Sequence, residues 1–457
     1  MPPERLLVWF CWVYMFVLGV AILLPYLRRK SDLLTTWNFM LLSLINFIGI
    51  SGLTAGYWPE LFRVKEFERR DYMDYMVGAI VFTVFLFLFY YKLNFAAKLA
   101  NRRFRKWPPQ SPATLFCMVA IACLMGLAVL FPLNIQGIGQ VIFQVGGKGS
   151  IFAFAFAFVA WWKQRKNPFL LSILLGTFFY AVLLAIVVGG GRRNMVGVLS
   201  VVPIALYWLT LRNRTPRYAL MVLGITGFCG MAVIAAYSEI RHFSRIDIKN
   251  VAAEDRSASS SLAALKEIPK RLMSSSTDHF LGQNCAQLSL TAIHIYRNEV
   301  ETKPFNALKF VLLTPIPRAI WEDKPIGLGF ELPKDAKANT RATWGPGIVG
   351  HGYHEGGLHM LVFYAFLTAF ALRFVDQLLI TQPNNSYLIA FLAAASGHLI
   401  GWARGDISTF TNQIIFCFLA MLVLAYSGRF LFGRSRLQPH LAQAPGRILR
   451  SKPSRAN

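Results

Sequence analysis

Residues 6–27 have the sequence LLVWFCWVYMFVLGVAILLPYL, an apolar run without a charged side chain. A membrane-spanning helix needs roughly 20 such residues to cross about 30 Å of hydrocarbon, so this run is long enough to span a bilayer. No small-residue cleavage site follows it, which argues against a signal peptide that is removed after export. The run therefore predicts a retained membrane helix.

The composition of the whole chain also indicates a lipid environment. Of its 457 residues, 55% are hydrophobic and 15% are charged, whereas about a quarter of the residues of an average soluble domain are charged. The apolar runs predict an all-α polytopic membrane protein with about eleven transmembrane helices, within a range of ten to twelve. The predicted spans are residues 6–27, 33–57, 75–91, 113–133, 150–162, 168–188, 195–211, 218–237, 355–372, 386–403 and 407–427. One of them alternates Phe and Ala as a strand would, but a lone strand cannot satisfy its backbone in lipid, so a helix is expected there too.

The spacing of these runs divides the chain into four parts. An N-terminal bundle of about eight helices covers residues 1–237, and a large outer loop covers residues 238–354. About three further helices cover residues 355–428, and a basic tail covers residues 429–457. Amphipathic helices are expected within the large loop, where they should lie on the membrane surface or cap the bundle.

The distribution of charge explains the net charge of +25. Cytoplasmic loops of membrane proteins are enriched in Lys and Arg. With the C-terminal tail inside, the inner segments carry 23 Lys and Arg against two acids, and the outer side keeps 24 basic and 20 acidic residues. The inner segments are residues 28–32, 92–112, 163–167, 212–217, 373–385 and 428–457. This predicts a cytoplasmic C-terminus, an outer location for the large loop, and anionic membrane lipids rather than nucleic acid as partners of the inner basic residues.

The six cysteines form neither a disulfide framework nor a zinc-binding spacing. His279 and His294 also lack the spacing of metal ligands. No cofactor and no metal site is therefore expected.

Three polar stretches fall on the predicted outer face. In residues 189–194, GGGRRN combines glycine amides, two arginines and a helix start that Asn194 can cap, which suits a phosphate group. Arginines anchored to lipid headgroups are the alternative. Residues 314–360, TPIPRAIWEDKPIGLGFELPKDAKANTRATWGPGIVGHGYHEGGLHM, gather Arg, Trp, His and Glu in an otherwise apolar chain. An Arg-Gly-Asp tripeptide, residues 404–406, lies between the last two spans and should face a cavity rather than lipid.

A further lysine ends a Gly- and Gln-rich segment before the fifth span. Lys148 is expected at the membrane interface with its ammonium group turned to water. Contact with a substrate phosphate is the alternative for this residue.

These motifs together resemble the oligosaccharide repeat-unit (O-antigen) polymerases, the Wzy-type family. The resemblance rests on GGGRRN between two helices, PIPRAIWEDKP in a large outer loop, GPGIVGHGYHEGG before the next helix, and an outer Arg-Gly-Asp. The order of spans and loops resembles that of the family over nearly the whole chain. The specific motifs cover about a tenth of the chain. One departure concerns the base: where relatives often have an acidic residue before the tyrosine, this chain has His351, and Glu355 follows Tyr353.

The resemblance implies a GT-C-like, metal-independent glycosyltransferase. Such an enzyme polymerises undecaprenyl-diphosphate-linked oligosaccharide repeat units at the periplasmic face of a bacterial inner membrane, in the synthesis of O-antigen lipopolysaccharide, exopolysaccharide or capsule. The expected partners are the lipid-linked oligosaccharide, membrane lipids and a chain-length regulator protein.

The reaction requires positively charged groups that stabilise the departing diphosphate. It also requires a base that accepts the proton of the attacking sugar hydroxyl. The candidate catalytic residues are Arg318, His351 and Glu355, with His351 favoured over Glu355 as the base. The candidate residues for binding the diphosphate or the sugars are Arg192, Arg193, Lys324, Arg341, Tyr353 and Arg404. The alternative for the histidines is a cap on a helix at the membrane interface.

Two other functions remain open. An O-antigen ligase-like transferase would use the same arginine chemistry and differ in its acceptor. A lipid-linked oligosaccharide flippase or other transporter belongs to a different class and would show internal repeats and charges inside its spans. The sequence shows no internal repeat, and its spans are almost free of charge.

Overall fold

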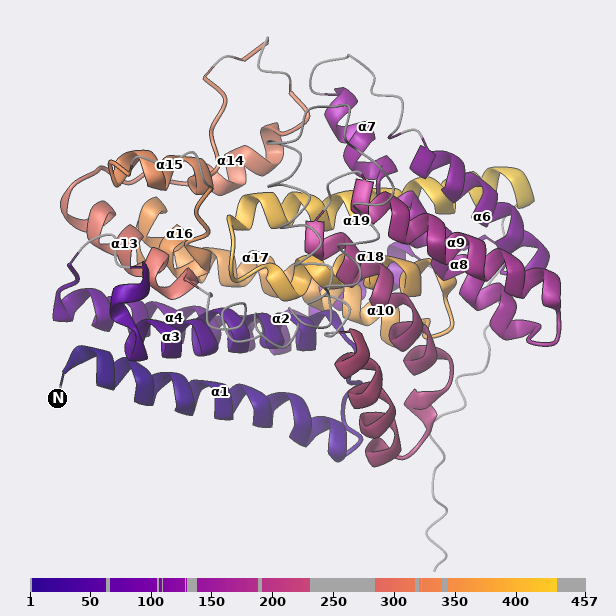
Figure 1. Ribbon diagram of the computed structural model, residues 1–457, viewed down its shortest axis with the longest axis horizontal. Coiled ribbons are helices and arrows are strands. Elements are labelled where there is room, and N and C mark those ends of the chain that lie inside the picture. The colour runs from indigo at the N-terminus through magenta and orange to yellow at the C-terminus, as the bar shows by residue number, and fades with distance from the viewer. Residues whose placement is uncertain are drawn as a thin grey trace, which may run out of the picture.

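The computed structural model describes residues 2–62, 66–104, 107–108, 110–127, 129, 138–187, 191–230, 284–316, 320–321, 323–338 and 343–433. This part of the chain forms helices and no strand (Figure 1). The α-helices are α1 (Pro3–Leu27), α2 (Thr36–Leu44), α3 (Ser51–Tyr57), α4 (Arg69–Lys92), α5 (Asn94–Arg103), α6 (Pro112–Leu127), α7 (Ile138–Gly146), α8 (Gly149–Lys163), α9 (Pro168–Val187), α10 (Gly191–Leu209), α13 (Cys285–Asn298), α14 (Asn306–Leu313), α15 (Leu328–Asp335), α16 (Gly347–Glu355), α17 (Leu358–Thr381), α18 (Ser386–Gly401) and α19 (Ile407–Phe432). A π-helical segment (Ile45–Ile50) joins α2 to α3, short 3₁₀ segments cover Pro59–Phe62 and Leu211–Asn213, and residues 216–230 are helical as well.

Seven of the described helices are long and apolar enough to cross a membrane. They are Pro3–Leu27, Thr36–Tyr57, Arg69–Lys92, Val141–Lys163, Pro168–Ala185, Leu358–Thr381 and Ile407–Phe432. Shorter apolar helices cover Pro112–Leu127, Arg193–Leu209 and Ser386–Gly401. The prediction of an all-helical membrane protein is therefore confirmed. Its count of about eleven spans stays a prediction, because three predicted spans correspond to the shorter helices and the span 218–237 is described only to residue 230.

The predicted span 355–372 is divided differently in the structure. Helix α17 begins at Leu358, while Glu355 ends the separate helix α16. Gly356 (φ 138°) and Gly357 (φ 77°) lie between them, in backbone conformations that other residues rarely adopt. The polar sequence before this span is therefore a helix of its own.

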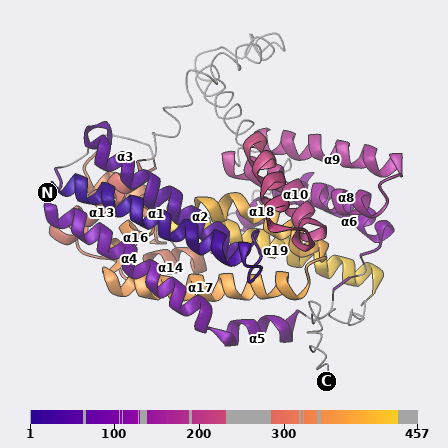
Figure 2. The same cartoon turned by 90° about the horizontal axis from the view of Figure 1, so that it is seen from below.

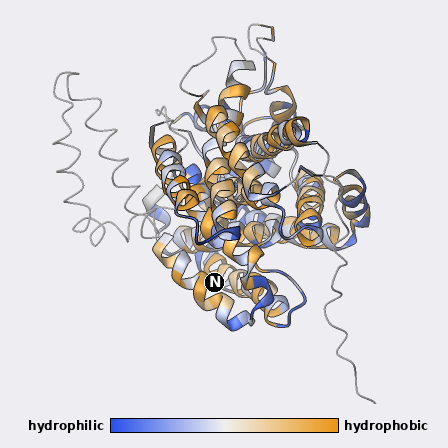
Figure 3. Ribbon diagram, turned by 90° about the vertical axis from the view of Figure 1, so that its right-hand side faces the viewer, coloured by the Kyte–Doolittle hydropathy of each residue, from blue (hydrophilic) through white to orange (hydrophobic). Residues whose placement is uncertain are grey.

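The outer faces of the long helices carry many apolar side chains, and Figure 3 shows that hydrophobic residues predominate in the helices. Large exposed side chains include Phe16 (71% exposed), Phe179 (66%), Phe228 (71%) and Phe430 (89%). Soluble proteins rarely expose wide apolar surfaces. These faces are suited to contact with lipid.

Helix α1 approaches the segment from α2 to α3 closely, because glycines line the contact. A Cβ atom at Gly49 would collide with Met15, and one at Gly52 would collide with Cys11. Small residues at such positions let two membrane helices pack against each other's backbone.

Loops that were predicted to lie on the inner side contact one another. Arg212 Nε lies 2.7 Å from Asp32 Oδ1, which joins the first and the fourth of these loops. Gln382 Nε2 donates a hydrogen bond of 2.7 Å to the carbonyl oxygen of Phe104, which joins the second and the fifth. Each of these pairs of loops therefore lies together at one end of its helices, as alternation of the spans requires.

Helices α13 and α16 lie at the end of the molecule where α1 begins (Figures 1 and 2), and α15 lies at the same end in Figure 1. Helix α13 packs against α3, α4 and α16. Its residues from Cys285 to Ile293 are all buried, so it is embedded in the end of the bundle instead of lying on the membrane surface. Helix α13 therefore caps the bundle, which was the second of the two arrangements expected for helices of the large loop.

Polar residues of α13 are satisfied by partners on α4. Arg297 lies 2.7 Å from Asp71 Oδ1 and 2.8 Å from Asp74 Oδ2, and His294 Nδ1 lies 3.1 Å from Asp71 Oδ2. Asp71 is fully buried at the start of α4, and its burial is tolerated because these basic side chains pair with it.

Asp376 is a buried carboxylate that holds three helices together. Its oxygens accept hydrogen bonds from the backbone N–H groups of Thr36 (2.8 Å) and Trp37 (3.0 Å), at the start of α2, and from the Tyr90 hydroxyl on α4 (2.8 Å). Asp376→Ala removes a helix cap and leaves these buried donors without an acceptor. We expect it to lower the free energy of unfolding by about 3 kcal/mol.

This effect can be measured by thermal or denaturant unfolding of the purified protein in detergent. Gln377→Ala, at the next position of α17 and with a partly exposed side chain, is the matched control. Equal stability of the two variants would contradict a role of Asp376 in joining α2 and α4 to α17.

Candidate active site

Helix α16 places three buried side chains on one face. His351, His354 and Glu355 occupy positions i, i+3 and i+4 and are at most 1% exposed. The helix starts at Gly347, where φ is 66° and a Cβ atom would collide with the carbonyl oxygen of Ala403. The loop before α16 therefore lies directly against the turn before α19.

Glu355 is held by two donors. Its Oε1 accepts a hydrogen bond of 2.9 Å from the backbone N–H of Ala307, and its Oε2 accepts one of 2.5 Å from the hydroxyl of Tyr364. His351 Nδ1 lies 3.8 Å from Glu355 Oε1. The carboxylate is thus oriented toward the imidazole of His351.

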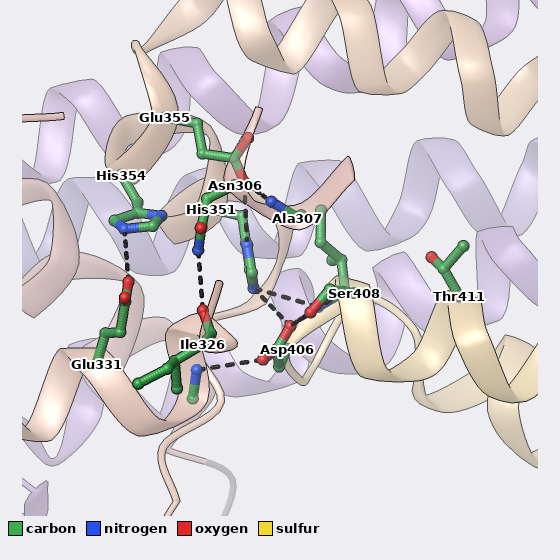
Figure 4. A network of polar contacts seen from close by, with 12 residues as sticks. Asn306, Ala307, Ile326, Glu331, His351, His354, Glu355, Asp406, Ser408 and Thr411 are labelled. Atoms are coloured by element: carbon green, nitrogen blue, oxygen red, sulfur yellow. Dashed lines mark hydrogen bonds and ion pairs between the residues drawn. The ribbon is translucent and has the colours of Figure 1, made fainter. Parts of the chain in front are cut away.

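Asp406 connects His351 to α19 (Figure 4). His351 Nε2 lies 3.5 Å from Asp406 Oδ1 and 3.2 Å from the backbone nitrogen of Ile407. Asp406 also caps α19, because its Oδ1 accepts a hydrogen bond of 3.0 Å from the backbone N–H of Ser408. The Asp of the Arg-Gly-Asp tripeptide is therefore part of this site.

His354 faces a different acid, on α15. Its Nε2 lies 3.2 Å from Glu331 Oε2, and its ring packs edge-on against Tyr296 at a centroid distance of 4.6 Å. Burial opposes the ionisation of Glu331, but the contacts with His354 and Lys303 outweigh it, so that the pKa of this carboxyl lies below its usual value. Glu331 is therefore an anion beside His354. We call His351, His354, Glu355, Glu331 and Asp406 the acid–base cluster.

A second cluster is cationic and lies at the starts of α8 and α10. The ammonium group of Lys148 is buried, 3.0 Å from Asn194 Oδ1 and 2.9 Å from His398 Nε2. The guanidinium group of Arg193 stacks on the ring of Phe410, 3.6 Å from its centroid. Among the described residues no carboxylate pairs with Lys148. We call Lys148, Arg193, Asn194 and His398 the cationic cluster.

The two clusters meet at the first turns of α19. Asp406 caps this helix and contacts His351, and Phe410, four residues later, lies under Arg193. Residues separated by four positions lie one helical turn apart, about 6 Å. The guanidinium group of Arg193 and the imidazole of His351 thus contact residues at the same end of α19.

An apolar cavity of about 250 Å³ begins at the same place. Tyr364 and Ile407 line it beside Glu355 and His351, and Leu372 and Val375 line it farther along α17. The distance along the helix from Tyr364 to Val375 is about 16 Å. The cavity therefore extends from the acid–base cluster into the apolar bundle.

The structure brings only some of the predicted site residues together. His351 and Glu355 lie side by side, and Arg193 lies in the cationic cluster. Arg318 and Arg341 lie outside the described residues, as does the side chain of Arg192.

The remaining three predicted residues have other surroundings. Tyr353 turns to the opposite face of α16, and its hydroxyl donates to the carbonyl of Asp74 at 3.2 Å. Lys324 donates to two carbonyls of its own loop, those of Thr314 and Ile316. Arg404 is half-buried, and its carbonyl oxygen accepts from Cys285 Sγ at 3.3 Å.

Two local predictions were wrong. Asn194 does not cap α10, because the helix already begins at Gly191 and Asn194 lies in its first turn, bound to Lys148. Lys148 does not turn its ammonium group to water, because its side chain is buried and donates to the amide oxygen of Asn194 within the bundle.

No protein family, characterised protein or solved structure matches this chain. Its function therefore has to be inferred from the geometry of the two clusters and the cavity.

Cys285 holds the turn before α19 and should be chemically inert. Burial raises the pKa of its thiol from 9.0 to about 12, so at pH 8 the reactive thiolate should be about 1,000-fold rarer than for an ordinary cysteine. We expect iodoacetamide to spare Cys285 in the folded protein and to modify it in sodium dodecyl sulfate. Peptide mass spectrometry measures both states, and rapid labelling of the folded protein would contradict this burial.

Proposed function

We propose that this protein is a membrane glycosyltransferase that polymerises undecaprenyl-diphosphate-linked oligosaccharide repeat units. The cationic cluster carries the proposal. Lys148 is buried beside Arg193 and has no carboxylate partner among the described residues, which is costly unless an anion joins it. A diphosphate is such an anion, and guanidinium and ammonium groups are its usual ligands in proteins.

The apolar cavity supports a lipid-linked substrate. A diphosphate carried on a polyprenyl chain needs charge for its headgroup and an apolar path for its tail. The cavity is lined by Leu399 and Thr411, the sequence neighbours of His398 and Phe410, so an apolar path lies close to the cationic cluster. A soluble sugar nucleotide would require only the first of these features.

The acid–base cluster supports transfer to a sugar hydroxyl. In this step the bond from the anomeric carbon to the diphosphate breaks, and the electron pair remains on the leaving diphosphate. The hydroxyl oxygen of the acceptor forms the new bond, and its proton passes to His351 or Glu355. Lys148 and Arg193 stabilise the charge that develops on the diphosphate, together with Arg318 of the predicted motif. The leaving group then needs no metal ion.

The charge distribution favours the periplasmic face of a bacterial inner membrane for this chemistry. The Arg-Gly-Asp turn and the large loop fall on the outer side when the C-terminus is cytoplasmic. Lipid-linked repeat units that are exposed on the periplasmic face would then be able to reach both clusters.

An O-antigen ligase-like transferase is the second candidate. The same two clusters would serve it, since only the acceptor differs. The Pro-Arg-x-x-Trp element at residues 317–321 favours the polymerase.

The experiment supplies the purified protein with a diphospholipid-linked repeat unit and follows the products by gel electrophoresis. We expect a ladder of longer lipid-linked glycans. Transfer of a single glycan to another acceptor, without a ladder, would identify a ligase. Movement of the lipid across liposomes without any new glycosidic bond would identify a transporter and overturn the proposal.

A further inference from the structure

The acid–base cluster has the composition of a metal site. One possible ligand atom from each of His351, His354 and Glu355 lies within 4.8 Å of the others, and all three side chains are buried. Two imidazoles and one carboxylate are a donor set that suits Zn²⁺ and related divalent transition metals.

The two imidazoles carry buried nitrogens without a partner. Nδ1 of His351 and both ring nitrogens of His354 form no hydrogen bond with any described residue. Buried polar atoms are almost always paired, because an unpaired one costs free energy. Two such atoms beside one carboxylate indicate that a further group belongs among them.

The opposite nitrogen of each ring faces an acid. His351 Nε2 lies 3.5 Å from Asp406 Oδ1, and His354 Nε2 lies 3.2 Å from Glu331 Oε2 (Figure 4). Metal-binding histidines almost always direct their second ring nitrogen at a carboxylate or carbonyl, which fixes the tautomer and makes the ligand more basic. Both rings therefore turn Nε2 toward a carboxyl group, which leaves Nδ1 of each ring available to an ion beside Glu355.

Glu355 retains the capacity to bind an ion. Each carboxylate oxygen has two lone pairs, and the donors Ala307 and Tyr364 use one on each oxygen. These donors also fix the orientation of the carboxylate, as the partners of a metal ligand do.

We propose that His351 Nδ1, His354 Nδ1 and Glu355 bind a divalent transition-metal ion of the zinc type. Binding selects the tautomer of His351. Its Nε2 can accept from the Ile407 N–H, which puts the proton on Nδ1, or it can donate to Asp406. An ion on Nδ1 requires the second form and makes Asp406 a partner of the site.

The ion leaves the proposed transfer unchanged but removes His351 as the proton acceptor, so the proton of the acceptor hydroxyl passes to the carboxylate oxygen of Glu355 that does not bind the ion. A dication on Nδ1 occupies the lone pair that His351 would need as a proton acceptor. Metal content and glycan extension are separate measurements, so each can fail without the other.

The test is zinc binding by the full-length protein in detergent. The protein is stripped with a chelator, titrated with Zn²⁺ against a chromophoric competitor, and analysed for bound zinc by mass spectrometry. We expect one ion per chain for the wild type and at least about 100-fold weaker binding for His351→Ala and His354→Gln. Glu331→Gln and Asp406→Asn keep the three ligands and should weaken binding about 10- to 100-fold.

The matched control is His359→Ala, which removes an exposed histidine four residues beyond Glu355. It should bind zinc as the wild type does, and zinc should raise the melting temperature of both but not of His354→Gln. Elution and melting temperature without zinc show whether each variant is folded. The proposal is overturned if the folded wild type binds no zinc at micromolar concentration, if folded His351→Ala and His354→Gln retain the ion, or if His359→Ala loses it.

Discussion

Lys148→Met should reduce glycan chain extension about 100- to 1,000-fold while leaving the protein folded. The ammonium group of Lys148 is buried beside Asn194 and His398, with Arg193 close by on Phe410. Loss of one fixed group that stabilises developing charge typically costs this much in rate. Methionine has a similar length and no charge to bury, so the bundle should tolerate it.

The measurement is the rate of ladder formation from the lipid-linked repeat unit, with thermal unfolding as the check on folding. Lys163→Met is the matched control because Lys163 lies on the same helix, α8, at its opposite and exposed end. A normal ladder from Lys148→Met would remove the cationic cluster from the reaction. An equal loss in both variants would indicate a general effect of charge.

The helices were predictable from the sequence because lipid permits few alternatives. Apolar runs without charge must form helices when no water can bind their backbone, and each described run is helical. The boundary between α16 and α17 was missed because it depends on two glycine conformations. A window of average hydropathy does not detect these.

The acid–base cluster could be predicted in part. Spacing of i, i+3 and i+4 puts His351, His354 and Glu355 on one face, whereas Tyr353 points elsewhere for the same reason. Glu331 and Asp406 could not be assigned to this cluster from the sequence, since their contacts depend on how α15 and α19 pack against α16.

The cationic cluster was the least predictable part of the site. Lys148 and His398 are 250 residues apart, and His398 lies within an apolar run where a single histidine attracts little attention. The position of His398 within a predicted membrane helix could nevertheless have drawn attention to it. A histidine in the interior of a membrane helix is costly without a partner, and such residues are often functional.

Thr368→Trp is the second substitution with a large expected effect. Thr368 lines the apolar cavity midway along α17, and an indole at this position would fill much of the space. If the cavity accepts the polyprenyl chain, the KM for a long-chain diphospholipid substrate should rise about 10- to 100-fold, because several buried methylene groups lose their apolar contacts. An analogue with a short lipid chain should be extended at the same rate by the variant and the wild type.

Comparing the KM values for the long-chain and short-chain substrates distinguishes a blocked cavity from a damaged catalytic site. Damage to either cluster would slow both substrates alike, since both carry the same diphosphate and sugars. Val423→Trp, on the lipid-facing side of α19 where Val423 is 49% exposed, adds the same indole outside the cavity and should change neither KM. If Thr368→Trp accepts the long chain as well as the wild type does, the tail binds elsewhere. The cavity would then be a packing defect between α14, α17, α18 and α19, and the cationic cluster alone would have to select the lipid carrier by its diphosphate.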